Sequence, residues 1–446
     1  MLHERETEKL AGIPESRVVA IWRNCLPGGH RLLTEDGDTV RLIYPGRRNH
    51  GGGADFLDAV IATDRGVLKG DIEIHVRSSG WWEHGHYLDP AYNRVIMHVV
   101  YGNDTDRAIR LHDGRNVPTL VLGGLPEIMA GQSANSGFLP CHDAGHRLSA
   151  DQIGHVLDAA GEARFQAKAA GFRGTPNGPG QALYEAIMAS LGYSANKLQF
   201  LKLARQVPLH RLESISSGST NSGEYLANVQ SMLLGVAGLL PTLRPATDTV
   251  CRNSEWVRKL EEQWHQNGNK AALYAGDWHL SGIRPANLPV RRIAAMSHLL
   301  VRYRRTGLLA GLTGGLDQLN NAVKYSDLEQ KLLVDAVGYW KLNLDYHLPV
   351  RKTAPALLGR GRAADIIVNV LLPFAAVNIS GGPAAEIYHA CPRLTVNNLE
   401  RHMLEQLGLD SRMVDSARRQ QGLLHIYRAF CSQGKCSECP LNRQIS

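Results

Sequence analysis

Ionisable side chains alternate along one short stretch of the chain, GDIEIHV at residues 70–76. A β-strand sends successive side chains to opposite faces, so Asp71, Glu73 and His75 share one face and the isoleucines between them take the other. Such a face can simply meet solvent, as in many antiparallel sheets. Carboxylates are also the ligands that hard divalent cations prefer, and a bound cation helps to cleave a phosphodiester bond. We therefore predict a metal-dependent hydrolytic site on this strand, with Asp71 as an assisting ligand.

A neighbouring strand supplies further carboxylates. Residues 54–63 are typical of a strand, and a short turn joins them to residues 66–76, which predicts a hairpin. This hairpin would bring Asp55 or Asp58 close to Glu73. We expect Asp55 and Glu73 to bind Mg²⁺ or Mn²⁺, with Asp58 assisting.

Histidines are dense just after this hairpin, in WWEHGHYLD at residues 81–89. His75 is placed to align or deprotonate an attacking water molecule. We expect His84 and His86 to face the same pocket and to contact the scissile phosphate or a second metal ion. A zinc hydrolase built from His75, His84 and His86 stays a subsidiary interpretation, because three histidines and a water form a known catalytic zinc sphere.

The aromatic residues of the same region allow two interpretations. Trp81 or Trp82 could stack on a nucleic-acid base. Alternatively, the tryptophans anchor a loop, and His98, which apolar residues flank, is a core histidine with satisfied hydrogen bonds. We favour the packing interpretation for these three residues.

The elements that must position these groups change in character along the chain. A helix is predicted at 11–24, and strands rich in Val and Ile are predicted at 39–46, 54–63, 66–76, 93–102 and 117–124. The order helix, three strands, helical turn and strand predicts an α/β or α+β domain with a mixed sheet. From about residue 150 onward the apolar spacing is helical. We expect three domains: a nuclease-like α/β domain at 1–148, a basic helical domain at 149–385, and a helical, cysteine-rich segment at 386–446.

The first domain resembles the PD-(D/E)xK nuclease superfamily, whose sites pair an Asp with an acidic-x-Lys strand inside a core of that element order. Gly53-Ala54-Asp55 would correspond to the PD element, and Glu73-Ile74-His75 to the acidic-x-Lys element. His75 then stands in place of the lysine, and a neutral imidazole lacks the permanent charge of an ammonium group. The resemblance implies a nuclease of the repair or defence type that depends on a divalent metal ion.

The whole chain is also similar to a large uncharacterised bacterial family, the domain of unknown function 2851. The similar stretches are GADFLDA, GDIEIHVRSSGWWEHGHYLDPAYNRVIMHVV, RPANLPVRR and QQGLLHIYRAFC. This second resemblance covers nearly all of the chain and implies no established activity.

Positive charge is concentrated in the later part of the chain. The net charge is +7, and residues 151–446 hold 33 Lys and Arg against 23 Asp and Glu. This surplus suits a polyanionic partner, and we expect DNA rather than RNA. Candidate contacts to the nucleic acid are Arg164, Lys168, Lys197, Arg284, Arg291 and Arg292.

Three cysteines near the C-terminus have the spacing Cys431-x4-Cys436-x2-Cys439. Thiols so close together can wrap one metal centre, and Cys391 is the nearest candidate for a fourth ligand. Some nucleases of the superfamily hold a [4Fe–4S] cluster on four cysteines, which this tail resembles. Structural Zn²⁺ is the rival interpretation, and unliganded thiols are the plainest one.

Other residues could complete or stay outside this centre. His425 and Cys25 are further candidates for the fourth ligand, whereas Cys141 and Cys251 are expected to be ordinary buried thiols. We also expect a cytoplasmic protein, because the charged start MLHERETEKL is unlike a secretory signal and no apolar run approaches membrane-spanning length. The competing functional hypothesis is an inactive nucleic-acid-binding or scaffold protein that retains a nuclease-like fold.

Overall fold

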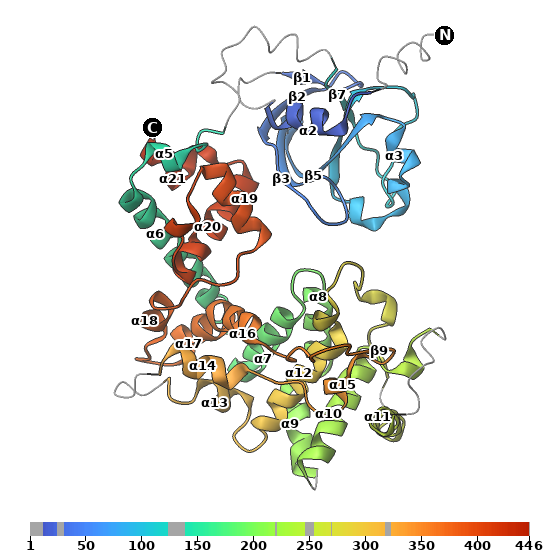
Figure 1. Ribbon diagram of the computed structural model, residues 1–446, viewed down its shortest axis with the longest axis vertical. Helices are drawn as coiled ribbons and strands as arrows, with labels where there is room; N and C mark the ends of the chain where they lie inside the picture. The colour runs from blue at the N-terminus through green and yellow to red at the C-terminus, as the bar shows by residue number, and fades with distance from the viewer. Residues whose placement is uncertain are drawn as a thin grey trace. The chain divides into compact units, whose positions relative to one another are not determined.

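The computed structural model describes residues 12–24, 31–123, 139–218, 221–245, 254–268, 270–316 and 323–445 (Figure 1). The chain forms two compact units. Unit 1 comprises Met1–Gly161, Val396–Asp415 and Arg419–Ser446, and unit 2 comprises Glu162–Thr395 and Ser416–Arg418. The division differs from the three-domain expectation, because most of the cysteine-rich C-terminal segment belongs to the same unit as the N-terminal sheet.

A mixed sheet forms the first part of unit 1, as predicted. Its strands are β1 (Leu32–Leu33), β2 (Thr39–Tyr44), β3 (Arg47–Arg48), β4 (Phe56–Thr63), β5 (Gly66–Arg77), β6 (Val95–Gly102) and β7 (Thr119–Val121). The order across the sheet is β1-β2-β4-β5-β6-β7, with β3 also paired to β4. Pairing is antiparallel from β1 to β5 and parallel from β5 through β6 to β7.

Short helices precede and interrupt these strands. Helix α2 (Glu15–Asn24) packs Val18 and Trp22, both 0% exposed, into the apolar core beside the sheet. Between β5 and β6 the chain passes through α3 (Gly80–Glu83), η1 (His86–Leu88) and η2 (Pro90–Tyr92). The observed order of a helix, antiparallel strands, a helical crossover and a parallel strand agrees with the sequence-based expectation.

Two irregularities in strand pairing flank Asp71. The pairing of β4 with β5 skips a residue, so Leu57 and Asp58 together oppose Asp71. On the other side of β5 the pairing with β6 skips Ile96. Asp58 has a φ of 61°, in the left-handed region that residues other than glycine rarely adopt. The extra residues lie on β4 and β6, whereas β5 runs without interruption through Asp71.

Helices complete unit 1. They are α5 (Ala144–Arg147), α6 (Ala150–Ala170), α19 (Asn398–Leu407), α20 (Ala417–Ala429) and α21 (Pro440–Ile445), of which α6 and α20 run on into unit 2. Their buried apolar residues form one cluster with Tyr44 and Val60 of the sheet. The C-terminal helices and the sheet therefore share a core.

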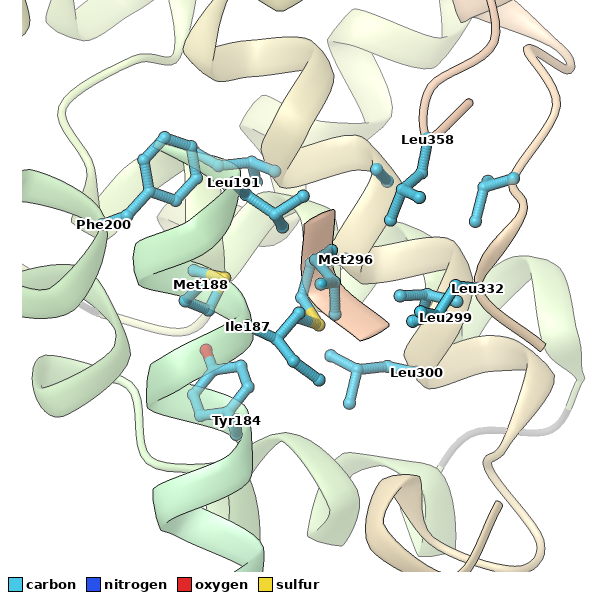
Figure 2. Packing of buried hydrophobic residues seen from close by; sticks show 14 of the residues in the cluster. Tyr184, Ile187, Met188, Leu191, Phe200, Met296, Leu299, Leu300, Leu332 and Leu358 are labelled. Carbon is cyan, nitrogen blue, oxygen red and sulfur yellow. The ribbon is translucent and has the colours of Figure 1, made fainter. Parts of the chain in front are cut away.

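Unit 2 is helical and has its own core. Its principal helices are α7 (Gly178–Leu191), α8 (Lys197–Gln206), α9 (Leu209–Gly218), α10 (Ser222–Val236), α11 (Glu255–Gln266), α12 (Pro289–Arg302), α14 (Tyr325–Leu332), α16 (Arg360–Ile366), α17 (Leu372–Asn378) and α18 (Ala384–His389). Figure 2 shows Ile187 and Met188 of α7 facing Met296 and Leu300 of α12. The apolar repeats of the sequence thus mark the faces that make this core.

Two segments of unit 2, Ser222–Leu243 and Arg360–Asn378, have the length and composition of membrane-spanning helices. Within their most apolar windows, 78% and 61% of the segment is buried inside the structure. Core helices meet the same criterion of length and composition.

Candidate functional site

Two carboxylates from neighbouring strands hold each other in place. The backbone N–H of Asp55 donates to Oε2 of Glu73 at 3.1 Å, and the N–H of Ile74 donates to Oδ2 of Asp55 at 3.1 Å. Each carboxylate therefore uses one oxygen to accept a hydrogen bond from the other strand. The hairpin predicted from the sequence is present, and it brings Asp55 and Glu73 together.

Two histidines lie beside the second oxygen of Glu73, and a third lies next to them. Nε2 of His86 lies 3.1 Å from Oε1 of Glu73, and a hydrogen bond between these side chains opposes the effect of burial on the pKa of Glu73. Nε2 of His75 lies 3.8 Å from the same oxygen and 3.0 Å from Nδ1 of His84. The three histidines can offer ligand atoms that all lie within 4.8 Å of one another. Imidazole nitrogens and a carboxylate oxygen this close together form a donor set that a divalent cation can bind.

The ring of His75 is held from two sides. Nδ1 of His75 lies 2.9 Å from Nε2 of His98, a residue that is 0% exposed. Gly80 leaves room for the ring, because a Cβ at this position would lie 2.8 Å from Cδ2 of His75. A buried partner that fixes the orientation of an imidazole also fixes which nitrogen it presents to a metal. His98 is thus a core histidine, as predicted, and it is placed to position His75. The expectation that its hydrogen bonds are satisfied is wrong in part, because its buried Nδ1 has no partner among the described residues.

Burial changes the protonation of the carboxylates and of two histidines in this region. Burial raises the pKa of Asp55 and of Glu73 above their usual values. Burial, together with neighbouring imidazoles, lowers the pKa of His75 to about 2 and that of His98 to about 3. Both rings are therefore neutral at physiological pH and do not balance the two carboxylates. A bound cation would supply the missing charge.

The donor set fits a divalent transition-metal ion better than Mg²⁺. Glu73 and Asp55 offer carboxylate oxygens, which suit Mg²⁺ and Mn²⁺, whereas imidazole nitrogens suit zinc and iron. The approach of Nε2 of His86 to Oε1 of Glu73, at 3.1 Å, indicates a mixed nitrogen and oxygen site. Mn²⁺ and Zn²⁺ both accept such a set.

Asp58 and Asp71 form a separate cluster. The N–H of Asp58 donates to Oδ1 of Asp71 at 3.0 Å, and Nη2 of Arg94 lies 3.0 Å from Oδ1 of Asp58. Oδ2 of Asp58 accepts from the hydroxyl of Tyr427 at 2.9 Å and lies 3.6 Å from Nε of Arg47. These contacts correct the expectation that Asp58 and Asp71 assist at the metal, because the bulge at Asp58 directs both carboxylates to arginines and a tyrosine instead.

Three further residues lie near the carboxylates without a local signal in the sequence. Glu15 begins α2, and its pKa is raised by burial and by the nearby charge of Asp55. Arg48 of β3 lowers the pKa of Asp55 through its positive charge. Tyr92 lies against His86 with ring centroids 4.0 Å apart. The sequence gives no sign that these three residues lie near Asp55 and Glu73, because the fold brings them together.

The tryptophans are packed, in agreement with the favoured interpretation. Trp81 is 0% exposed, and its Nε1 donates to the carbonyl of Arg110 at 3.2 Å. The guanidinium of Arg107 covers the ring of Trp82 at 3.5 Å from its centroid. Neither ring is open for stacking on a base.

The expected nucleic-acid contacts in unit 2 have different environments. Arg291 is 0% exposed and donates to the carbonyls of Trp340 and Asn343, and Arg292 is likewise buried. Both are therefore structural, which corrects their assignment as contacts to a nucleic acid. The stretch RPANLPVRR suggested an exposed basic patch, but helix α12 turns these two arginines into the protein interior.

The other four basic candidates reach the surface to different degrees. Arg164 and Lys168 are half-buried on α6, where Lys168 donates to Oδ1 of Asn369. Lys197 and Arg284 are exposed. Their contact with nucleic acid remains a prediction.

The cysteines are gathered differently from the expectation. Cys431, Cys436 and Cys439 line one small pocket together with Cys141, which the sequence suggested to be an ordinary thiol. Cys391 is instead buried in the helical core of unit 2. This placement corrects the choice of Cys391 as the fourth ligand. The spacing along the chain gave no sign of Cys141, and the other candidate residues Cys25 and Cys251 lie outside the described residues.

A family model described as "protein of unknown function (DUF2851)" matches residues 15–395 of the chain. The chain belongs to this family. The matched region contains Asp55, Glu73 and the histidines around them. No curated protein and no solved structure matches the chain.

Proposed function

We propose that this DUF2851 protein is a divalent-metal-dependent nuclease that cleaves phosphodiester bonds in DNA at the site of Asp55, Glu73 and the histidines. The single observation that carries this proposal is the convergence of donor atoms beside Glu73, where Nε2 of His86 lies 3.1 Å from Oε1 of Glu73 and the ligand atoms of His75, His84 and His86 lie within 4.8 Å of one another. Two buried carboxylates beside imidazoles form a site that favours a cation. Divalent cations at such sites promote phosphodiester hydrolysis.

Each residue of this site has a separate proposed role. Glu73 and His86 would hold the metal ion, and Asp55 and His75 would complete its ligands. The bound ion would supply Lewis acidity for the phosphate and for the attacking water. His98 positions His75 through the contact between their ring nitrogens at 2.9 Å. His84 is the exposed member of the group, so it can accept a proton and return it to solvent. His75 is neutral and buried, and it therefore does not replace the permanent charge of a lysine.

Further features favour DNA as the substrate class. Arg48 is exposed beside Asp55 and could contact a phosphate, and the later part of the chain carries the basic surplus. The order of helix, antiparallel strands, crossover and parallel strand is also that of the superfamily that the site resembles. Lys197 and Arg284 remain the exposed basic candidates on unit 2.

Cleavage of defined DNA substrates tests the proposal. The purified protein is incubated with single-stranded, duplex and branched DNA in Mg²⁺, Mn²⁺ or Zn²⁺, and the products are separated on gels. We expect cleavage that is faster in Mn²⁺ than in Mg²⁺, and a loss of at least about 100-fold in Glu73→Gln. The matched control is Glu83→Gln, because Glu83 is an exposed carboxylate that contacts only Arg77, at 3.8 Å. Cleavage that survives Glu73→Gln would remove the site.

A zinc hydrolase remains the second candidate, because His75, His84 and His86 can offer three nitrogens that lie within 4.8 Å of one another. Activity restored by Zn²⁺ alone, after removal of all metals, would favour it over the Mn²⁺ enzyme. An inactive nucleic-acid-binding protein would retain DNA with a strong salt dependence and leave it intact in all three metals.

A further inference from the structure

We propose that Cys141, Cys431, Cys436 and Cys439 together ligate an iron–sulfur cluster. This cluster would fasten the C-terminal segment of unit 1 to the rest of that unit. The four side chains line one small pocket that Pro140, Phe430 and Asn442 complete. This site shares no residue with the carboxylate site, and it does not depend on the proposed nuclease activity.

Two parts of the chain, far apart in sequence, bring the sulfurs together. Cys141 precedes α5, and the other three cysteines follow α20 in two short turns, η9 (Cys431–Gln433) and η10 (Cys436–Glu438). Gly434 links the turns with a φ of 70°, in the left-handed region that glycine adopts without strain. Nε2 of Gln406 lies 3.6 Å from Sγ of Cys141 and 3.8 Å from Sγ of Cys431.

Several features distinguish this group from thiols that merely fill a core. None of the four cysteines forms a disulfide, and all four face the same space. The backbone N–H groups of Leu441 and Asn442 oppose the effect of burial on the pKa of Cys439, which places amide donors beside its sulfur. Amide hydrogen bonds to sulfur are a common second shell of metal–thiolate centres.

The spacing of the sulfurs favours a cluster over a single ion. Among the described residues, the group whose ligand atoms come within 4.8 Å of one another is the three histidines, so the thiols are spread more widely. Four sulfurs at about 2.3 Å from one Zn²⁺ would stand roughly 3.8 Å apart. A cluster of several iron atoms separates its thiolates further.

The centre would hold the C-terminal turns against the sheet. A Cβ at Gly434 would lie 2.9 Å from Cγ1 of Val60 and 3.0 Å from Cγ2 of Ile43, so this turn packs closely on β4 and β2. Nζ of Lys69 donates to Oε1 of Gln433 at 2.6 Å. The role of the cluster is therefore structural, and its loss would loosen α20 and α21 from the sheet.

Metal analysis of the full-length protein, purified without oxygen, tests this inference. We expect broad absorbance near about 400 nm, with iron and acid-labile sulfide in equal amounts and little zinc. Cys141→Ser should lose at least half of the iron and the colour. Cys391→Ser is the matched control, because it changes a thiol buried to a similar degree in the core of unit 2; it should keep both.

Cys436→Ser is a second test that is less prone to misfolding, because Cys436 is the least buried of the four thiols. It should lose iron while circular dichroism shows retained helices. A colourless protein, whether metal-free or with one zinc per chain, would overturn the iron–sulfur assignment. Iron that survives Cys141→Ser but not Cys391→Ser would overturn the ligand set.

Discussion

Two buried carboxylates two residues apart on β5 meet opposite surroundings. Asp71 and Glu73 are 4% and 5% exposed, and burial raises the pKa of each. Asp71 lies 3.4 Å from the guanidinium of Arg94, so the protein supplies its positive charge. Glu73 instead faces the imidazoles of His75 and His86.

The difference shows how the fold separates a structural carboxylate from a candidate ligand. A carboxylate that an arginine already balances gains little from a metal ion, whereas one among imidazoles can share a cation with them. The separation comes from the neighbouring side chains, because Arg94 lies beside Asp71 and two histidines lie beside Glu73. The comparison predicts that metal affinity and folding stability depend on different residues.

The largest expected effect is on metal binding. Glu73→Gln should weaken Mn²⁺ binding at least about 100-fold, because it removes a charged ligand, whereas Asp71→Asn should change it by less than about threefold. Isothermal titration calorimetry with Mn²⁺ on metal-free protein measures both. A loss of Mn²⁺ binding in Asp71→Asn as large as in Glu73→Gln would end the distinction between the two carboxylates.

A smaller effect concerns the buried histidines and pH. Burial lowers the pKa of His98 from 6.5 to about 3, so the folded state resists a proton that the unfolded state accepts. The contribution of His98 to stability is therefore present above pH 6.5 and is lost as the pH falls towards 3. In metal-free protein, the free energy of unfolding of His98→Phe should rise relative to that of the wild type as the pH falls from 6.5 towards 3. The difference should grow by up to about 1.4 kcal/mol per pH unit.

Urea unfolding from pH 7 to pH 4 measures this difference directly. The wild type also contains carboxylates with raised pKa values, whose contribution runs the other way, but they are common to both proteins and cancel in the comparison. Unfolding curves whose separation stays constant with pH would show that His98 is not held neutral.

The smallest expected effect is on the structural cluster. Tyr427→Phe removes the hydroxyl that donates to Asp58 at 2.9 Å and should cost about 1–2 kcal/mol in the free energy of unfolding, with unchanged Mn²⁺ affinity. Tyr184→Phe is the control, since it removes a buried hydroxyl that has no partner in the described structure and should cost less. Chemical denaturation compares the two variants. An altered Mn²⁺ affinity in Tyr427→Phe would show that the cluster of Asp58 and Asp71 belongs to the same site as Glu73.

Local patterns were sufficient to predict the hairpin that carries Asp55 and Glu73. Strand periodicity and a short turn are encoded within neighbouring residues, so the pairing of β4 with β5 could be foreseen. The bulge at Asp58 could not, because it requires an aspartate at a φ of 61° that contacts from Arg94 and Tyr427 stabilise. Asp58 and Asp71 therefore looked like metal ligands in the sequence.

The same contrast applies to residues that meet across the chain. The spacing of Cys431, Cys436 and Cys439 is local and was visible, whereas Cys141 joins them only through the shared core of the sheet and the C-terminal helices. Sequence proximity favoured Cys391, which unit 2 buries in its own core. Arg291 and Arg292 looked like surface charges for a similar reason, since local sequence does not reveal which face of a helix is covered.

The sequence by itself determined the mixed α/β start, the helical texture after it, and the strand that carries Glu73 and His75, because periodicity and turn residues act over a few positions. Only the tertiary structure decided which buried carboxylate is balanced by an arginine and which faces imidazoles. It also decided which four thiols share a pocket. Those outcomes depend on contacts between residues tens or hundreds of positions apart, and on bulges whose strain the surrounding core must offset.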